Sequence, residues 1–257
     1  MYRFALMLCL IGTVSAMEPA EVVGPDSTQG LRGKVILLAG ATGDNGSAVL
    51  RQLGDLGLRV RAMSRDADAA REKYGTRHEW VQADVTDPAS LARAMAGVDM
   101  VISAVATWMP VGGNRPEKVY YDGIINLAKA AKAAGVKRMV IITSVHSGES
   151  GGFLNVIGGD VLVWMGKAEA ALIASGVEYV IVGPARTNDE TGGARQIRLI
   201  SRVKYASGMT ITRTDLASVV IGVAGMPAAA NRAFAVTNTD AAADSRWADG
   251  LVAMPSR

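Results

Sequence analysis

The stretch "LLAGATGDNGSAVL" (37–50) joins an apolar run to the start of a helix through a turn that contains three glycines, Gly40, Gly43 and Gly46. The run before the turn, "KVILLAG" (34–40), is continuously aliphatic and predicts a buried strand. Residues 45–56 repeat apolar side chains at helical spacing, and Gly57 marks their end. Glycine permits a positive φ and a close approach of main chain, so the turn is predicted to hold a ligand against bare backbone.

A helix that starts directly after such a turn offers free N–H groups and partial positive charge, which together suit a diphosphate. In this arrangement Gly40 allows the tight turn, Gly43 the approach of the phosphate and Gly46 close packing of helix on strand. The strand before and the helix after give the glycine spacing the context of dinucleotide binding. The alternative is a glycine-rich connection without a ligand. The candidate cofactor-binding residues of this turn are Gly40, Thr42, Gly43, Asp44, Asn45 and Gly46.

Short apolar runs alternate with longer amphipathic runs along the rest of the chain. This alternation predicts an α/β fold, a Rossmann-type doubly wound parallel sheet of about seven strands. Residues 33–257 show no convincing linker and are expected to form a single domain. The glycine-rich loops 147–160 and 188–195 are expected to form a small substrate lid, although they equally fit plain surface loops. Further strands are predicted at 59–65, 78–84, 99–106, 137–144, 177–184 and 232–238, and helices at 87–98, 116–136, 161–175, 213–225 and 244–253.

Composition excludes several classes of function. The chain has 257 residues, of which 49% are hydrophobic and 20% charged, so a packed core is expected and wholesale disorder is not. The net charge of +3 comes without a long basic run, which gives nucleic-acid binding little support. Cys9 is the only cysteine, and His78 and His146 are the only histidines. No disulfide framework and no metal site are therefore expected.

The amino terminus has the layout of a secretory signal peptide. Arg3 precedes an apolar segment, and small residues at Val14-Ser15-Ala16 predict cleavage after Ala16. The apolar run is short for a transmembrane helix, which needs roughly 20 residues. The protein is thus expected in the periplasm or a secretory lumen, with no stable membrane span after cleavage. The alternatives are an uncleaved anchor, or a wrongly chosen start codon and a cytoplasmic protein. Residues 17–32 are expected to be a flexible lead-in.

The end of the second predicted strand indicates which dinucleotide binds. An acidic residue there would bond the ribose 2′-OH of NAD, whereas an arginine accommodates the 2′-phosphate of NADP. Arg65 occupies this position and favours NADP through a charge-assisted contact. Asp66 follows directly, which keeps NAD open, and the alternative for Arg65 is a solvated loop cation.

Two further segments are expected to contact the cofactor. Asp84 and Val85 follow the third strand and are predicted to bind the adenine, unless Asp84 only caps the helix that follows. Ala104 and Val105 follow the fourth strand and would form a floor under the cofactor, although they are small enough to be core residues.

The segments "AGATGDNG", "ADVTD", "VISAVA", "VKRMVIITS", "SGVEYVIVGP" and "ITRTDLASVV" resemble those of the atypical short-chain dehydrogenase/reductases. The most similar branch is the single-domain NAD(P)-binding group with the NmrA-like proteins and biliverdin reductase B. The resemblance runs from Lys34 to Asp240 and implies a Rossmann fold with NADP at the carboxyl ends of its strands. It also implies that Lys167 contacts the nicotinamide ribose, unless it is a surface lysine, and that Pro184, Ala185 and Arg186 border the nicotinamide.

The chain departs from that family at its general acid, because Val163 stands where active reductases place a tyrosine four residues before the lysine. A positioned general acid contributes about 10²–10⁴-fold to rate, and valine cannot donate a proton. Ser144 and His146, near the end of the fifth strand, are the candidate replacements, and His146 is alternatively a solvated loop residue. One of the adjacent residues Tyr120 and Tyr121 is expected to face the site, and Trp108 is a candidate pocket wall. The candidate catalytic residues are Ser144, His146 and Lys167.

Three functions remain open on this basis. The first is an NADP-dependent oxidoreductase that transfers a hydride to a small carbonyl, quinone or flavin-like acceptor. The second is a non-catalytic, dinucleotide-responsive regulatory protein, which the missing tyrosine favours. The third is an epimerase or isomerase with a retained cofactor.

Overall fold

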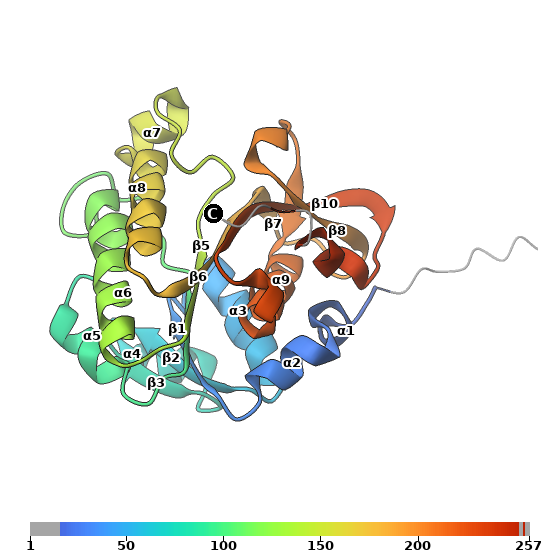
Figure 1. The fold of residues 1–257 in the computed structure, drawn as a ribbon. Helices are drawn as coiled ribbons and strands as arrows, with labels where there is room; N and C mark the ends of the chain where they lie inside the picture. Colours follow the sequence, from blue (N-terminus) through green and yellow to red (C-terminus); the bar gives the residue numbers. More distant parts are fainter. Residues whose placement is uncertain (1–15, 252–253, 255–257) are drawn as a thin grey trace, which may run out of the picture.

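The computed structural model describes residues 16–251 and 254, and its centre is an eight-stranded sheet flanked by helices (Figure 1). The strand order is β3-β2-β1-β4-β5-β6-β10-β8. All neighbouring strands are parallel except β8, which runs antiparallel to β10. The strands are β1 (Val35–Ala39), β2 (Arg59–Ser64), β3 (Glu79–Gln82), β4 (Met100–Ser103), β5 (Arg138–Ile142), β6 (Glu178–Pro184), β8 (Arg195–Ile200) and β10 (Arg232–Ala242).

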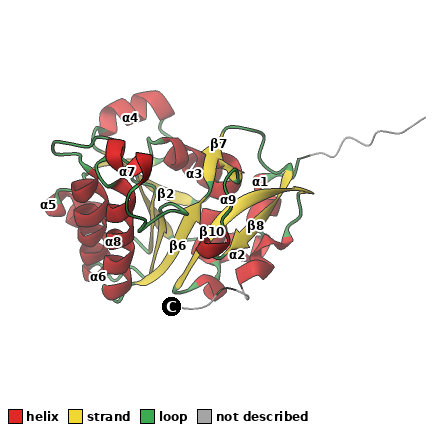
Figure 2. Ribbon diagram, turned by 90° about the horizontal axis from the view of Figure 1, so that it is seen from above, coloured by secondary structure: helices red, strands yellow, loops and turns green. Residues whose placement is uncertain are grey.

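The two faces of the sheet bury separate layers of side chains, which confirms the predicted Rossmann-type fold. In β1, Ile36 and Leu38 point into one layer while Leu37 and Ala39 point into the other, as strand alternation requires. Figure 2 shows α5, α6 and α8 on one side of the strands and α1, α2 and α9 on the other. The helices are α1 (Pro19–Val23), α2 (Pro25–Leu31), α3 (Asp44–Asp55), α4 (Ala67–Tyr74), α5 (Pro88–Ala94), α6 (Gly123–Ala133), α7 (Gly152–Gly158), α8 (Val161–Ala174) and α9 (Arg213–Gly225).

Residues 17–32 do not form the expected flexible lead-in. They fold into α1 and α2, which pack on α9 and bury Val22, Val23 and Leu31. The approach of α2 to α9 is close, because a Cβ added at Gly30 would lie 2.6 Å from the carbonyl oxygen of Gly225. The indole N–H of Trp247 also donates to the Val22 carbonyl oxygen at 2.6 Å. The stabilisation from burying these apolar side chains against α9 therefore exceeds the preference of Pro and Gly for loop conformations in this segment. The predicted signal peptide falls on residues 1–15, outside the described residues, and on Ala16.

Several elements differ from the predicted pattern. The single helix expected at 116–136 begins as a π-helix, η1 (Glu117–Asp122), and continues as α6. The loop 147–160 contains α7, and β8 starts at the end of the loop 188–195 and adds an eighth strand. The expected terminal helix is 3₁₀ at Arg246–Leu251. Short parallel strands β7 (Arg186–Asn188) and β9 (Thr210–Thr212) form a second sheet. In the part of the chain that is described, no helix is long and apolar enough to cross a membrane.

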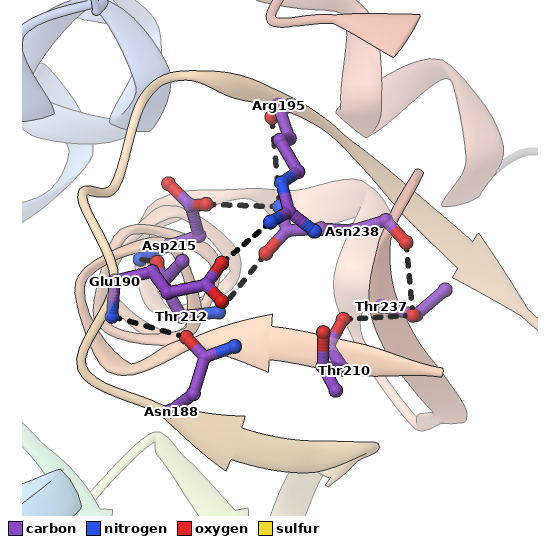
Figure 3. A network of polar contacts seen from close by, with 8 residues as sticks. All are labelled: Asn188, Glu190, Arg195, Thr210, Thr212, Asp215, Thr237 and Asn238. Atoms are coloured by element: carbon purple, nitrogen blue, oxygen red, sulfur yellow. Dashed lines mark hydrogen bonds and ion pairs between the residues drawn. The ribbon is translucent and has the colours of Figure 1, made fainter. Parts of the chain in front are cut away.

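A buried polar network ties this small sheet to α9 (Figure 3). Asp215, in the first turn of α9, accepts hydrogen bonds from the Gly193 N–H at 2.7 Å and from the Asn238 side-chain amide at 2.9 Å. Asn238 in turn accepts from the Thr212 N–H, and the Thr212 hydroxyl accepts from the Asp215 N–H as the N-cap of α9. One carboxylate therefore holds three chain segments that lie far apart in the sequence.

Asp215→Ala should lower the free energy of unfolding by about 3 kcal/mol. The substitution removes the acceptor of the buried Gly193 N–H and of the partly buried Asn238 amide, and each unsatisfied buried group costs roughly 1–3 kcal/mol. The measurement is a urea denaturation curve, with Asp240→Ala as the control because Asp240 lies exposed on β10. The control should change stability by less than about 0.5 kcal/mol. Equal stability of the two variants would show that the network does not hold the fold.

Candidate functional site

A cavity of about 960 Å³ lies at the carboxyl ends of the parallel strands. Open α/β sheets bind their ligands at this edge, because the connections after the strands leave a crevice there. The segments that line the cavity follow β1, β2, β3, β4, β5 and β6 in turn. Of the residues predicted to form the site, the cavity brings together Gly40, Thr42, Gly43, Asp44, Asn45, Arg65, Asp84, Val85, Ala104, Val105, Ser144, His146, Pro184 and Ala185.

The turn after β1 requires glycine at two of its three glycine positions. Gly40 has a φ of +79°, and a Cβ there would lie 2.6 Å from the carbonyl oxygen of Ala104. A Cβ at Gly46 would lie 1.9 Å from the carbonyl oxygen of Gly40, so α3 packs directly on the turn. Gly43 differs, because a Cβ there would meet only the Gly40 oxygen, at 3.5 Å. The open face of Gly43 borders the cavity, where a side chain would take the space of a ligand.

The start of α3 is free to bind an anion. Gly43 is the N-cap of this helix and provides no side-chain hydrogen bond to its first N–H groups. The Asn45 Oδ1 atom is buried at the same place without a hydrogen-bond partner among the described residues. Uncapped N–H groups, a helix dipole and a glycine that leaves space beside them suit the diphosphate of a dinucleotide.

At one end of the cavity, two acidic side chains, Asp66 beside the lining and Asp84 within it, each use one carboxylate oxygen in hydrogen bonding, while one basic side chain is free. Asp66 caps α4 by accepting from the Ala69 N–H at 2.9 Å, and Arg65 has no ion-pair partner among the described residues. Asp84 accepts from both the N–H and the hydroxyl of Thr86 through Oδ1 at 2.8 Å. The cap of α5 is Asp87 rather than Asp84, so the other carboxylate oxygen of Asp84 stays available.

At the other end, Ser144 and His146 lie together after β5. The Ser144 hydroxyl oxygen accepts from the His146 N–H at 3.2 Å. The imidazole Nδ1 lies 2.9 Å from a carboxylate oxygen of Glu149, and the ring stands edge-on to Tyr205 with centroids 4.8 Å apart. This packing fixes the orientation of the imidazole at the cavity wall.

Lys167 does not reach the cavity, contrary to the expectation from the family resemblance. It is exposed on α8, and its Nζ lies 3.9 Å from the ring centroid of Trp164. The residues of α8 that line the cavity are Leu162 and Met165, which share a helix face at a spacing of three residues. Lys167 lies two residues after Met165 and thus on the opposite side of the helix. Val163 is also absent from the cavity lining. Neither the position of the family's catalytic tyrosine nor its lysine therefore faces the site.

Three polar or aromatic residues are notable among the cavity residues that were not assigned from the sequence. Tyr120 lies on η1, Tyr205 packs on His146, and Arg213 starts α9. The Arg213 guanidinium pairs with Asp189 at 2.5 Å and reaches Asp44 of the glycine turn at 3.7 Å. The sequence indicated that either Tyr120 or Tyr121 faces the site. It contains no signal for Tyr205 and Arg213, because their positions depend on how residues 186–212 fold.

Apolar side chains dominate the end of the cavity away from Arg65. The expected pocket wall Trp108 lies there and is 61% exposed. Met109 and Leu154 are also exposed at the rim, while Leu162 and Met165 lie buried deeper. This end therefore suits an apolar molecule with few polar groups.

The glycine turn, the uncapped helix and the cavity at the strand ends define a Rossmann-type dinucleotide-binding protein. The family model described as NAD(P)H-binding matches residues 40–227. The chain therefore belongs to the NAD(P)H-binding family, and a nicotinamide dinucleotide is its cofactor class. This match confirms the NAD(P)-binding family that the sequence motifs predicted.

Relatives in this family include reductases. Sanguinarine reductase of Eschscholzia californica is 30% identical over 240 residues, which cover 77% of this chain and 87% of that protein. The NAD(P)H azoreductase of Xenophilus azovorans is 28% identical over 233 residues, which cover 87% and 74%. A solved structure, a putative NAD-dependent epimerase/dehydratase from Bacillus halodurans, matches with a TM-score of 0.71 at 23% identity and covers 82% of this chain and 96% of its own. This last likeness concerns the fold.

Proposed function

We propose that the protein is an NADPH-dependent oxidoreductase that transfers a hydride to an apolar, conjugated acceptor of the quinone or flavin type. One observation carries the proposal. A single cavity runs from the glycine turn, past the ends of β4 and β5, into an apolar pocket bordered by Trp108 and Met165. Cofactor and acceptor would thus lie in one continuous space. The two relatives described above are both named as reductases, which supports the same class of reaction.

The preference for NADPH rests on the contrast between two neighbouring side chains. Asp66 does not line the cavity and uses one carboxylate oxygen as a helix cap, whereas Arg65 lines the cavity without an ion-pair partner among the described residues. A free guanidinium suits a 2′-phosphate through bidentate, charge-assisted hydrogen bonds. An NAD-specific site would instead need a free carboxylate at this point.

The chain's own residues bind and orient the reactants. When bound, the nicotinamide supplies the hydride. The main chain around Gly43 holds the diphosphate, and the apolar side chains of the pocket contact the acceptor. Ser144 and His146 offer polar contacts to the acceptor. Since neither Val163 nor Lys167 faces the cavity, an acceptor that takes a hydride without a strong general acid fits better than a simple ketone.

We expect the purified protein to oxidise NADPH in the presence of menadione or free flavin, and much more slowly with small aldehydes or ketones. A small carbonyl develops a basic alkoxide on reduction, and the cavity lacks the family tyrosine that would protonate it. The measurement is the loss of NADPH absorbance across such a panel. NADPH binding without consumption by any acceptor would contradict the proposal and favour the regulatory alternative. Product formation without net cofactor change would favour an epimerase.

The regulatory alternative has one structural observation in its favour, the absence of Val163 and Lys167 from the cavity. A protein of that kind would bind the dinucleotide and change its affinity for a partner. The apolar pocket beside the cofactor space is not required for such a role, so the oxidoreductase is the better supported function.

Export from the cytoplasm is a separate proposal, based on the signal-like layout of residues 1–16. We expect a native chain that begins at Met17. Amino-terminal sequencing of the protein from its source tests this, and an intact Met1 would contradict it.

A further inference from the structure

The cavity contains a tyrosine that is not part of the family's tyrosine–lysine pattern. Tyr120 comes from η1, on the wall formed by the segment after β4, and it is 4% exposed. Its hydroxyl oxygen accepts a hydrogen bond from the Thr107 N–H at 3.3 Å. Thr107 is followed directly by Trp108 and Met109 of the apolar rim, so the hydroxyl lies at the acceptor end of the cavity.

The hydrogen of the Tyr120 hydroxyl has no acceptor among the described residues. A tyrosine hydroxyl can donate one hydrogen bond as well as accept, and the Thr107 N–H uses only its accepting capacity. The neighbouring Thr107 hydroxyl donates to the Asn114 carbonyl at 2.6 Å and accepts from the Met109 N–H at 3.2 Å, and no hydrogen bond joins it to the Tyr120 hydroxyl. A buried donor without a partner is costly unless a ligand supplies one.

The π-helix separates Tyr120 from the tyrosine beside it. The Gly123 N–H donates to the Lys118 carbonyl five residues earlier, which widens this turn relative to an α-helix. Tyr120 lines the cavity, whereas Tyr121 packs on Trp164 of α8 with ring centroids 5.8 Å apart. Single-turn π-helices occur often at functional sites, where they redirect side chains.

Tyr120 keeps its proton under ordinary conditions. Burial disfavours the phenolate and raises the pKa of Tyr120 to about 12. The group therefore acts as a neutral hydrogen-bond donor rather than as a base, and a proton transfer that left a buried phenolate would be unfavourable.

We infer that Tyr120 donates a hydrogen bond to the acceptor, at the carbonyl oxygen of a quinone or the equivalent oxygen of a flavin. This inference rests on the proposed function and names a specific group of the same site. As the hydride arrives, negative charge develops on that oxygen, and a fixed, buried donor stabilises it. Tyr120 thus takes over, from a different element, part of the role that Val163 cannot fill.

The test compares Tyr120→Phe with the matched control Tyr121→Phe. Menadione, or the tightest-binding member of a quinone and flavin panel, is titrated into each protein already saturated with NADP⁺. No hydride is available in this complex, so binding is measured apart from turnover. Tyr120→Phe should weaken acceptor binding about three- to tenfold, the effect of one hydrogen bond. It should leave NADP⁺ affinity unchanged and lower thermal stability modestly, because the Thr107 N–H loses its acceptor. Tyr121→Phe should leave acceptor affinity unchanged.

Turnover provides the second measurement. With NADPH and the same acceptor, Tyr120→Phe should lower kcat by about 10²-fold while the KM for NADPH stays constant. Unchanged acceptor affinity in Tyr120→Phe would overturn the inference, even if the wild-type protein is an active reductase. If the wild type binds the acceptor without consuming NADPH, the proposed function fails and the binding comparison still decides the role of Tyr120. Absence of quinone and flavin binding to the wild type would overturn both.

Discussion

Gly46→Ala should abolish measurable binding of NADPH and NADH alike. A Cβ at this position would lie 1.9 Å from the Gly40 carbonyl oxygen, which no real Cβ contact tolerates. The obstacle is backbone, so either α3 moves away from β1 or the turn changes shape. Both movements displace the N–H groups of α3 from the diphosphate, and we expect at least a roughly 100-fold loss of affinity for either cofactor. The free energy of unfolding should also fall, by about 1–3 kcal/mol for overpacking of this kind.

Substitutions at two other glycines distinguish an effect on cofactor binding from an effect on the packing of the fold. Gly43→Ala should also weaken both cofactors, but with little change in thermal stability, because a Cβ there meets nothing closer than 3.5 Å. Gly113→Ala should change neither property, since nothing lies within 4 Å of its Cβ position. Isothermal titration and thermal unfolding of the three variants give the comparison. Wild-type affinity in Gly46→Ala would show that the turn does not hold the cofactor.

Arg65→Ala should lower the affinity for NADPH about ten- to thirtyfold and leave the affinity for NADH unchanged. Charge-assisted hydrogen bonds contribute about 1.5–3 kcal/mol each, and exposure of Arg65 places the expected loss in the lower part of that range. The difference between wild type and variant should shrink at high salt, because an exposed charge pair is screened. The measurement is a pair of titrations at two ionic strengths.

A second arginine provides a control for the change in net charge. Arg93 is exposed on α5 and does not line the cavity, so Arg93→Ala should keep the wild-type preference for NADPH. Equal losses of NADPH and NADH affinity in Arg65→Ala would defeat the assignment to NADP. The available oxygen of Asp84 would then need to be tested as the group that selects the cofactor.

The sequence predicted the parts of this site that depend on local pattern. The run before Gly40 and the spacing of the glycines identified a strand, a turn and a helix, and the structure has them at Val35–Ala39 and Asp44–Asp55. Residues that directly follow strands, such as Arg65, Asp84 and Ser144, line the cavity for the same reason, and their roles there remain predictions. In a parallel sheet, the ends of the strands meet at one edge whatever the details of the helices.

What the sequence did not predict depends on helix rotation and on contacts distant in sequence. The choice between Tyr120 and Tyr121 is set by the π-turn, which has no local sequence signal. Lys167 faces away because the packing of α8 presents Leu162 and Met165 to the cavity. The segment 17–32 looks like a loop in isolation and becomes helical against α9, to which it is joined only through the completed fold.

The most direct test of the account is a titration of the protein, freed of any co-purified nucleotide, with NADPH, NADP⁺, NADH and NAD⁺. The account predicts saturable binding of one dinucleotide per chain, with the phosphorylated pair bound more tightly than the other. A well-folded protein without affinity for any of the four would contradict the assignment of the glycine turn, and with it the proposed reaction.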